Sequence, residues 1–294
     1  MSSKFIESIN ATYGSAAKDA YESKHNAKGS EAIAAAFGYR AEDLTSIPDG
    51  ANMGLSCGNP LAVASVKKGE TVIDLGSGGG FDVFIAARQA GAMGRVVGVD
   101  QNPDMLKLAN KNKAKGGYAN VEFVEAPITK IPLEDAMGDC IISNCVINLV
   151  PAMEKHLVFE EMFRLLKPGG RVSVSDLLAR KELPTEMRND VAAYVGCISG
   201  AALVSEYEGW LKSAGFGEVM IVDAQQDCNQ YKRCGPDDGE GARDGCCSSV
   251  PATPDLPSCC GSSKNREASK MSKSTEEADL NEWIGSFKIY AVKQ

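Results

Sequence analysis

This chain of 294 residues carries ten cysteines, whose thiolates can act as nucleophiles and as ligands of soft metals. Four are spread over the first 227 residues, and six fall between residues 228 and 260. The four are Cys57, Cys140, Cys145 and Cys197, and the six are Cys228, Cys234, Cys246, Cys247, Cys259 and Cys260. The first residues, MSSKFIESIN, contain no apolar signal-peptide core, so we expect the chain in the cytoplasm. In that reducing compartment, ten thiols favour soft-metal or redox chemistry over a disulfide scaffold.

A glycine-rich loop, DLGSGGG over residues 74–80, is the second feature that could do chemistry. Glycines allow a tight turn and let backbone N–H groups approach a ligand closely. Asp100 ends the next apolar segment, where a carboxylate can accept both hydroxyl groups of a ribose. The dinucleotide pattern G-x-G-x-x-G fails, because Phe81 stands at its third glycine position. The loop does fit the pattern D-x-G-x-G-x-G.

Alternating apolar and helical segments must position these residues. Five short segments rich in Val and Ile predict buried parallel strands over 71–76, 95–100, 121–126, 139–144 and 171–177. Helical patterns between them cover 81–91, 103–116 (with Asn102 as N-cap before Pro103) and 153–170. The alternation predicts an α/β fold with a doubly wound, Rossmann-like sheet, and segments 218–224 and 286–294 predict a terminal antiparallel hairpin.

Three cysteines fall on loops at the carboxyl edge of this predicted sheet, where open α/β sheets bind ligands. Cys145 directly follows the fourth strand, Cys57 lies in a Gly-rich loop before the first, and Cys197 follows a predicted helix after the fifth. We expect these three thiols to converge, although any one of them alone could be a small buried hydrophobe. Cys140, inside the fourth strand, is predicted to be such a buried residue.

The charge balance excludes some partners. With 31 basic and 39 acidic residues the net charge is −8, so we expect no nucleic-acid partner, because that binding relies on Lys and Arg neutralising phosphates. No apolar run approaches the roughly 20 residues that span a bilayer, so we expect no membrane partner.

The strand, the D-x-G-x-G-x-G loop and the acidic strand end together resemble the Rossmann-like class of S-adenosylmethionine-dependent methyltransferases. The resemblance implies S-adenosylmethionine as methyl donor. By position, it implies that the methionyl part is contacted by Asp74, Gly76, Ser77 and Gly78, and the ribose by Asp100. It places Gln101, Met105 and Ile128 near the adenine, and Asn144 on the reactive side of the cofactor.

Four further motifs narrow the resemblance to arsenite S-adenosylmethionine methyltransferases. These are GANMGLSCGNP, DLGSGGGFD, IISNCVINLVP and GCISGA, and the similarity runs over residues 31–222 and the last strand. The resemblance implies that Cys57, Cys145 and Cys197 bind trivalent arsenic and catalyse its methylation. It also implies that cysteines or external thiols (thioredoxin or glutathione) reduce the arsenic between rounds. Relatives often carry a further N-terminal cysteine, whereas no cysteine precedes Cys57 here.

The implied chemistry needs no general base. Trivalent arsenic is soft and prefers sulfur ligands, and three sulfurs leave a lone pair that can attack the methyl group in line. The chain has only two histidines, His25 and His156, and we expect both to be solvated rather than catalytic.

The resemblance and the composition divide the chain into four parts. Residues 1–60 are predicted to form a helical extension or lid, 61–224 the methyltransferase domain, 225–282 a flexible cysteine-rich insertion, and 283–294 the last strand. The adjacent pairs Cys246-Cys247 and Cys259-Cys260 suggest that the insertion captures arsenite or relays reducing equivalents. A tolerated disordered loop is the alternative.

Two other functions stay open at this point. One is methyl transfer from S-adenosylmethionine to a small organic acceptor, and the other is metalloid sequestration by a thiol-rich protein. The leading hypothesis is an enzyme that methylates arsenite or its thiol conjugates for detoxification.

Overall fold

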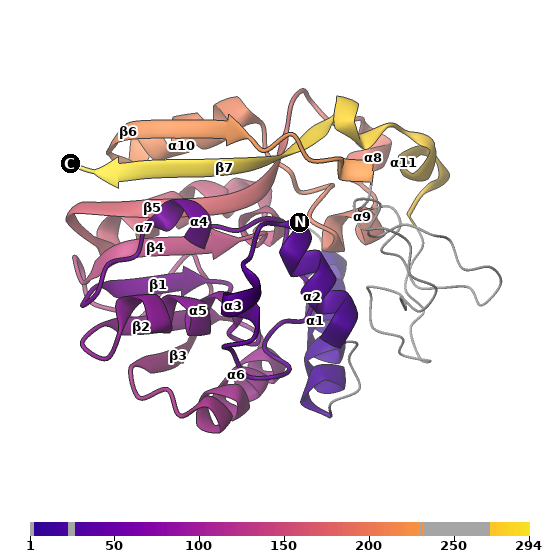
Figure 1. The fold of residues 1–294 in the computed structure, drawn as a ribbon. Coiled ribbons are helices and arrows are strands. Elements are labelled where there is room, and N and C mark those ends of the chain that lie inside the picture. Colours follow the sequence, from indigo (N-terminus) through magenta and orange to yellow (C-terminus); the bar gives the residue numbers. More distant parts are fainter. Residues whose placement is uncertain (1–2, 23–26, 230, 232–270) are drawn as a thin grey trace.

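The computed structural model describes residues 3–22, 27–229, 231 and 271–294, and its centre is a seven-stranded sheet in the order β3-β2-β1-β4-β5-β7-β6 (Figure 1). The strands are β1 (Thr71–Leu75), β2 (Arg95–Asp100), β3 (Val121–Glu125), β4 (Gly138–Asn144), β5 (Leu166–Ala179), β6 (Phe216–Asp223) and β7 (Ile284–Lys293). The first five are parallel, and β7 lies antiparallel between β5 and β6. The predicted α/β fold class and terminal hairpin are confirmed.

Helices and short 3₁₀ turns connect and cover the strands. The α-helices are α1 (Ser3–Tyr21), α2 (Ala27–Ala36), α3 (Ala41–Leu44), α4 (Leu61–Ala64), α5 (Phe81–Ala90), α6 (Pro103–Gly116), α7 (Lys155–Leu165), α8 (Thr185–Arg188), α9 (Val191–Val195), α10 (Val204–Ala214) and α11 (Lys273–Glu277). The 3₁₀ turns are η1 (Ile147–Leu149), η2 (Ala152–Glu154) and η4 (Leu280–Glu282). Asn102 caps α6 as predicted, because its side chain accepts the backbone N–H groups of Asp104 and Met105. The helix predicted over 153–170 is shorter, since α7 ends at Leu165 and the Lys-Pro-Gly-Gly run belongs to β5.

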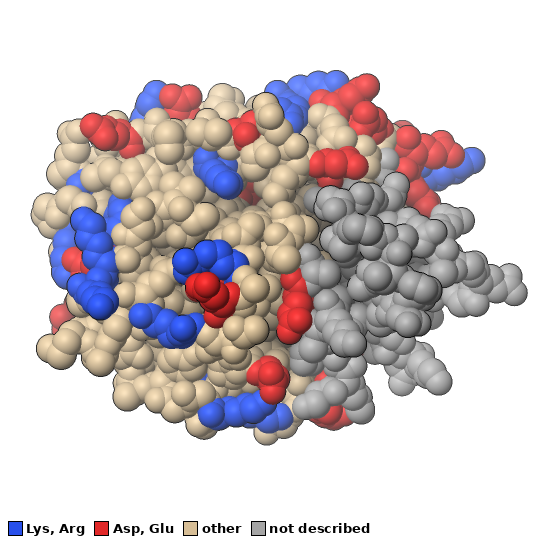
Figure 2. Space-filling model, viewed as in Figure 1, with Lys and Arg blue, Asp and Glu red and all other residues tan. Residues whose placement is uncertain are grey.

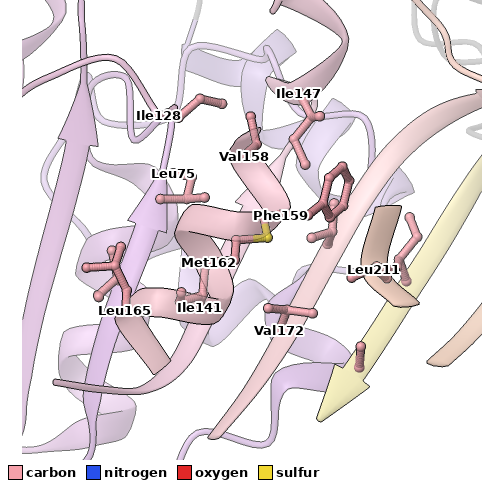
Figure 3. Packing of buried hydrophobic residues seen from close by; sticks show 14 of the residues in the cluster. Leu75, Ile128, Ile141, Ile147, Val158, Phe159, Met162, Leu165, Val172 and Leu211 are labelled. Carbon is pink, nitrogen blue, oxygen red and sulfur yellow. The ribbon is translucent and has the colours of Figure 1, made fainter. Parts of the chain in front are cut away.

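The core lies on both faces of the sheet, which is why the parallel strands are rich in Val and Ile. On one face, α7 places Phe159 and Met162 against strand residues such as Ile141, as Figure 3 shows. On the other face, α5 buries Phe84 against the same sheet. Each such side chain stabilises the fold by roughly 1.5–3 kcal/mol through burial.

The chain order creates a crevice at the carboxyl edge. In the strand order, β2 and β4 are the two neighbours of β1. The chain runs from β1 toward β2 and from β4 toward β5, so the loops after β1 and β4 diverge at the carboxyl edge. Helices α1 and α9 stand at this edge (Figure 1), and the hydroxyl of Tyr13 on α1 donates to the carbonyl of Val195 on α9 at 3.1 Å. The N-terminal helix therefore lies against the site that the sheet positions.

The segment expected to be a flexible insertion, 225–282, has ordered ends. Helix α11 and turn η4 occupy its last residues. At its start the backbone N–H of Cys228 donates to the side chain of Asn281 at 2.7 Å. Cys234, Cys246, Cys247, Cys259 and Cys260 lie outside the described residues, so the hypotheses about them and the four domain boundaries stay predictions.

The described surface mixes both signs of charge, as Figure 2 shows for one face. Within the described ranges, no helix combines the length and apolarity that a bilayer crossing requires. The cytoplasmic location remains a prediction.

Candidate active site

A cavity of about 290 Å³ opens at the carboxyl edge of the sheet. Its lining includes all nine residues that the family resemblance implies for the cofactor: Asp74, Gly76, Ser77, Gly78, Asp100, Gln101, Met105, Ile128 and Asn144. Helix α1 contributes Ile6, Ile9, Asn10 and Tyr13 to the same lining. Sequence reasoning missed these helical residues individually, because nothing in the local pattern of α1 points to the cavity.

The glycine loop approaches the segment after β4 very closely. Gly76 has φ +74°, and a Cβ atom on it would lie 2.6 Å from Val146. Only glycine permits both the left-handed backbone and this approach. Beside it, the buried hydroxyl oxygen of Ser77 has no hydrogen-bond partner among the described residues, so it is free to meet a ligand.

Asp100 joins the end of β2 to the glycine loop. One of its carboxylate oxygens accepts the backbone N–H of Gly78 at 2.9 Å, and the other accepts that of Asn102 at 2.8 Å. Desolvation raises the pKa of Asp100, while these hydrogen bonds act in the opposite direction. Each oxygen keeps a lone pair that can accept a ligand hydroxyl.

Asp82 is a site residue that sequence reasoning missed. It lies in the first turn of α5 and lines the cavity together with Asp74, and both carboxyls are buried. Burial raises the pKa of Asp82 to about 6, although hydrogen bonds from Tyr39 (2.7 Å) and Asn144 (3.2 Å) lower it. Burial raises the pKa of Asp74 as well, and the charges of Asp82 and Asp100 add to the effect. The available signal was the aspartate that directly follows the Gly-Gly-Gly-Phe run.

Two buried carboxyl groups in one cavity disfavour their own ionisation unless a cation joins them. The lining formed by Asp74 and Asp82 therefore suits a ligand that carries a positive charge.

Asn144 connects the cavity to the cysteine loop. Its side-chain nitrogen donates to the carbonyl of Gly58 at 2.9 Å, and its side-chain oxygen accepts the backbone N–H of Cys57 at 3.1 Å. The same nitrogen faces Asp82, so one amide contacts both the acidic wall and the loop that carries a thiol.

The three predicted thiols meet, as expected, in one buried cluster. Cys57 and Cys145, separated by 88 residues, form a disulfide, which the sequence had not predicted. Cys145 lines the cavity, whereas Cys57 and Cys197 are buried in the adjoining cluster. The thiol of Cys197 donates to the carbonyl of Cys145 at 2.9 Å. In this oxidised form, Cys57 and Cys145 offer no thiolate, so reduction must precede soft-metal binding by all three sulfurs.

Charged groups surround the remaining thiol of the three. Burial raises the pKa of Cys197, the carboxylate of Asp176 raises it further, and the ammonium of Lys155 lowers it. Lys155 is itself buried and donates to the carbonyl of Ile147 at 2.9 Å. The cation of Lys155 and a hydrogen bond from Tyr13 are thus the groups that favour its thiolate.

The remaining residues named in the sequence analysis are Cys140 and the two histidines. Cys140 is fully buried inside β4, which confirms its packing role. His156 is exposed on α7, as expected of a solvated side chain, and His25 lies outside the described residues.

Comparison with known proteins identifies relatives. Residues 66–215, just over half of the chain, match the family model described as a methyltransferase domain. An arsenite methyltransferase of Halobacterium salinarum is 42% identical over 217 residues, which are 70% of this chain and 54% of that protein. The human arsenite methyltransferase is 33% identical over 162 residues, or 52% of this chain and 43% of that protein. The chain thus spans about half the length of these curated relatives.

Two solved structures share the fold. The arsenic(III) S-adenosylmethionine methyltransferase of Chlamydomonas reinhardtii superimposes with a TM-score of 0.55 at 24% identity, covering 90% of this chain and 73% of that one. Geranyl diphosphate C-methyltransferase of Streptomyces coelicolor gives 0.58 at 18% identity, covering 80% and 77%. With a family model matching over half of its residues, and with curated arsenite methyltransferases among its homologues, the chain belongs to the methyltransferase-domain family.

Proposed function

We propose that this protein transfers the methyl group of S-adenosylmethionine to thiolate-bound trivalent arsenic, taken from arsenite or its thiol conjugates. The observation that carries the proposal is that Cys57, Cys145 and Cys197 share one buried cluster, of which Cys145 lines the cavity of the cofactor motif. The relatives named as arsenite methyltransferases support the same activity.

The cavity residues suit S-adenosylmethionine, which supplies an electrophilic methyl group on a sulfonium when bound. Asp74 and Asp82 would offset its positive charges, and the unpartnered hydroxyl of Ser77 would add a hydrogen bond. Asp100 would accept the ribose hydroxyls, and the buried side chains of Met105 and Ile128 would cover the adenine.

Cys145 is the thiol that would present arsenic to the donor, because it is the one that lines the cavity. The three thiolates would hold arsenic with its lone pair free, so catalysis reduces to placing that lone pair in line with the methyl group. Methyl transfer leaves the arsenic pentavalent. Two thiols can return it to the trivalent state by giving up two electrons and forming a disulfide, such as that between Cys57 and Cys145. An external thiol, of the thioredoxin or glutathione kind, would then reduce that disulfide.

One assay tests the proposal against its alternatives. The reduced protein is incubated with labelled S-adenosylmethionine, a thiol and arsenite, and the products are separated. Label in methylated arsenicals is the expected result. Label only in an organic acceptor would establish a different methyltransferase, and tight arsenite binding without label transfer would establish sequestration. Cys140→Ser serves as the matched control, since this thiol packs inside a strand away from the cavity lining.

A further inference from the structure

The first cysteine of the cysteine-rich segment belongs to the same buried cluster as the site thiols. Cys228 is fully buried there with Cys57, Cys145 and Cys197. It is also held in place: its backbone N–H donates to Asn281 at 2.7 Å, and Asn281 donates in turn to Asp227 at 2.8 Å. A fourth sulfur therefore belongs to the buried cluster that holds the disulfide and a third thiol, although the sequence assigned it to a flexible insertion.

Ser286 on β7 relates Cys228 to Cys57. Its hydroxyl donates to the carbonyl of Cys57 at 3.1 Å, and its backbone N–H faces the sulfur of Cys228. Ser286 is itself only 2% exposed, so this link between the two cysteines is buried. The other free thiol of the cluster, Cys197, approaches the opposite partner of the disulfide, since it donates to the carbonyl of Cys145.

Position separates the two free thiols of this cluster, because Cys228 is linked through Ser286 to Cys57, whereas Cys197 contacts the backbone of Cys145. Burial raises the pKa of Cys228 to about 11, the N–H of Ser286 and the cation of Arg180 lower it, and the carboxylates of Asp223 and Asp227 raise it. Arg180 is held near by an ion pair with Asp223 at 2.6 Å. The thiolate is the attacking form in disulfide exchange.

We propose that Cys228 is the resolving thiol of the Cys57–Cys145 disulfide. The thiol of Cys228 loses its proton, and its sulfur attacks the sulfur of Cys57. The Cys57–Cys145 bond breaks and a Cys57–Cys228 bond forms. Cys145 leaves with the electron pair and takes up one proton, so the exchange involves no net oxidation or reduction. A dithiol reductant then supplies two electrons and two protons to the Cys57–Cys228 disulfide and restores both thiols.

This exchange would release Cys145, the thiol that lines the donor cavity, and would move the disulfide to two cysteines outside the cavity lining. The part that this exchange would play in the catalytic cycle rests on the proposed arsenic methylation, but the exchange itself needs neither arsenic nor a methyl donor. The two proposals can therefore fail separately.

Trapping tests the pairing directly. In the full chain, Cys145→Ser leaves Cys57 without its partner, and mild oxidation with diamide followed by alkylation and peptide mass spectrometry reports the new bond. A Cys57–Cys228 peptide is the expected product. Cys57 recovered alkylated, or joined to Cys197 or to another cysteine, would overturn the assignment.

A rate measurement covers the case in which the trapped variant misfolds. The oxidised wild type, Cys228→Ser and Cys140→Ser proteins are treated with dithiothreitol, and release of the Cys145 thiol is followed by timed alkylation. We expect release to slow at least about tenfold in Cys228→Ser and to stay unchanged in Cys140→Ser. Equal rates in all three would refute the role. A pre-reduced Cys228→Ser protein should still methylate arsenite in a single turnover, which separates a resolving role from general damage to the site.

Discussion

The side-chain oxygen of Asn144 accepts the backbone N–H of Cys57 at 3.1 Å, across 87 residues of sequence. The same amide donates toward Asp82 in the wall of the donor cavity. One side chain at the end of β4 therefore sets the position of both the loop that carries Cys57 and the wall that carries Asp82. Neither the strand nor the loop alone could fix the distance between a methyl donor and a thiol-bound acceptor.

Replacing this amide should damage catalysis more than cofactor binding. Asn144→Ala removes the acceptor for Cys57 and the donor to Gly58, and we expect kcat/KM for arsenite to fall about 10- to 100-fold, equivalent to roughly 1–3 kcal/mol of lost positioning. Binding of S-adenosylhomocysteine, followed by calorimetry, should weaken less than about fivefold. Asn110→Ala, which removes a helix-surface hydrogen bond to Leu106, is the control. Equal losses in both measurements would contradict the positioning role.

Cofactor binding should strengthen as the pH rises through the pKa of Asp82, which burial places at about 6. The raised pKa means that the empty site holds a proton at pH 5, whereas a cationic ligand needs the ionised carboxylate. Binding of S-adenosylhomocysteine, whose ammonium retains a positive charge, should be about tenfold weaker at pH 5 than at pH 7. Asp82→Asn should flatten this dependence, and Asp49→Asn, at an exposed carboxyl, should retain it. A dependence unchanged in Asp82→Asn would show that another group titrates.

The glycine loop offers a matched pair of substitutions. Gly76 and Gly69 both have left-handed backbones, with φ +74° and +85°, but a Cβ on Gly76 would meet Val146 at 2.6 Å while one on Gly69 would meet nothing within 4 Å. Gly69→Ala should lower the free energy of unfolding by about 1–2 kcal/mol through backbone strain alone. Gly76→Ala should cost more and abolish cofactor binding. Denaturant unfolding and calorimetry measure both effects, and equal destabilisation would mean that the contact with Val146 relaxes freely.

Cys145→Ser should abolish arsenic methylation and leave cofactor affinity within about threefold of the wild type. The reason is that the lost sulfur binds arsenic, the methyl acceptor, rather than S-adenosylmethionine, the methyl donor. Labelled product formation and binding of S-adenosylhomocysteine report the two properties. A Cys145→Ser protein that still methylates arsenite at the wild-type rate would remove Cys145 from the site.

Much of the donor side could be predicted from sequence because its signals are local. The apolar period of β1 and β2, the glycines at 76 and 78 and the Asn102 cap act over a few residues, so they specify the same conformation wherever the chain packs. Once the parallel sheet was predicted, the carboxyl-edge rule was enough to bring Cys57, Cys145 and Cys197 to one place.

The sequence by itself therefore determined the fold class, the cofactor loop and the neighbourhood of the three thiols. Only the tertiary structure decided which thiols pair, that Asp82 shares a wall with Asp74, and that Cys228 packs into the same cluster. The reason is physical. These relationships join residues from different strands and helices, and their geometry depends on how whole faces pack rather than on any local propensity or spacing.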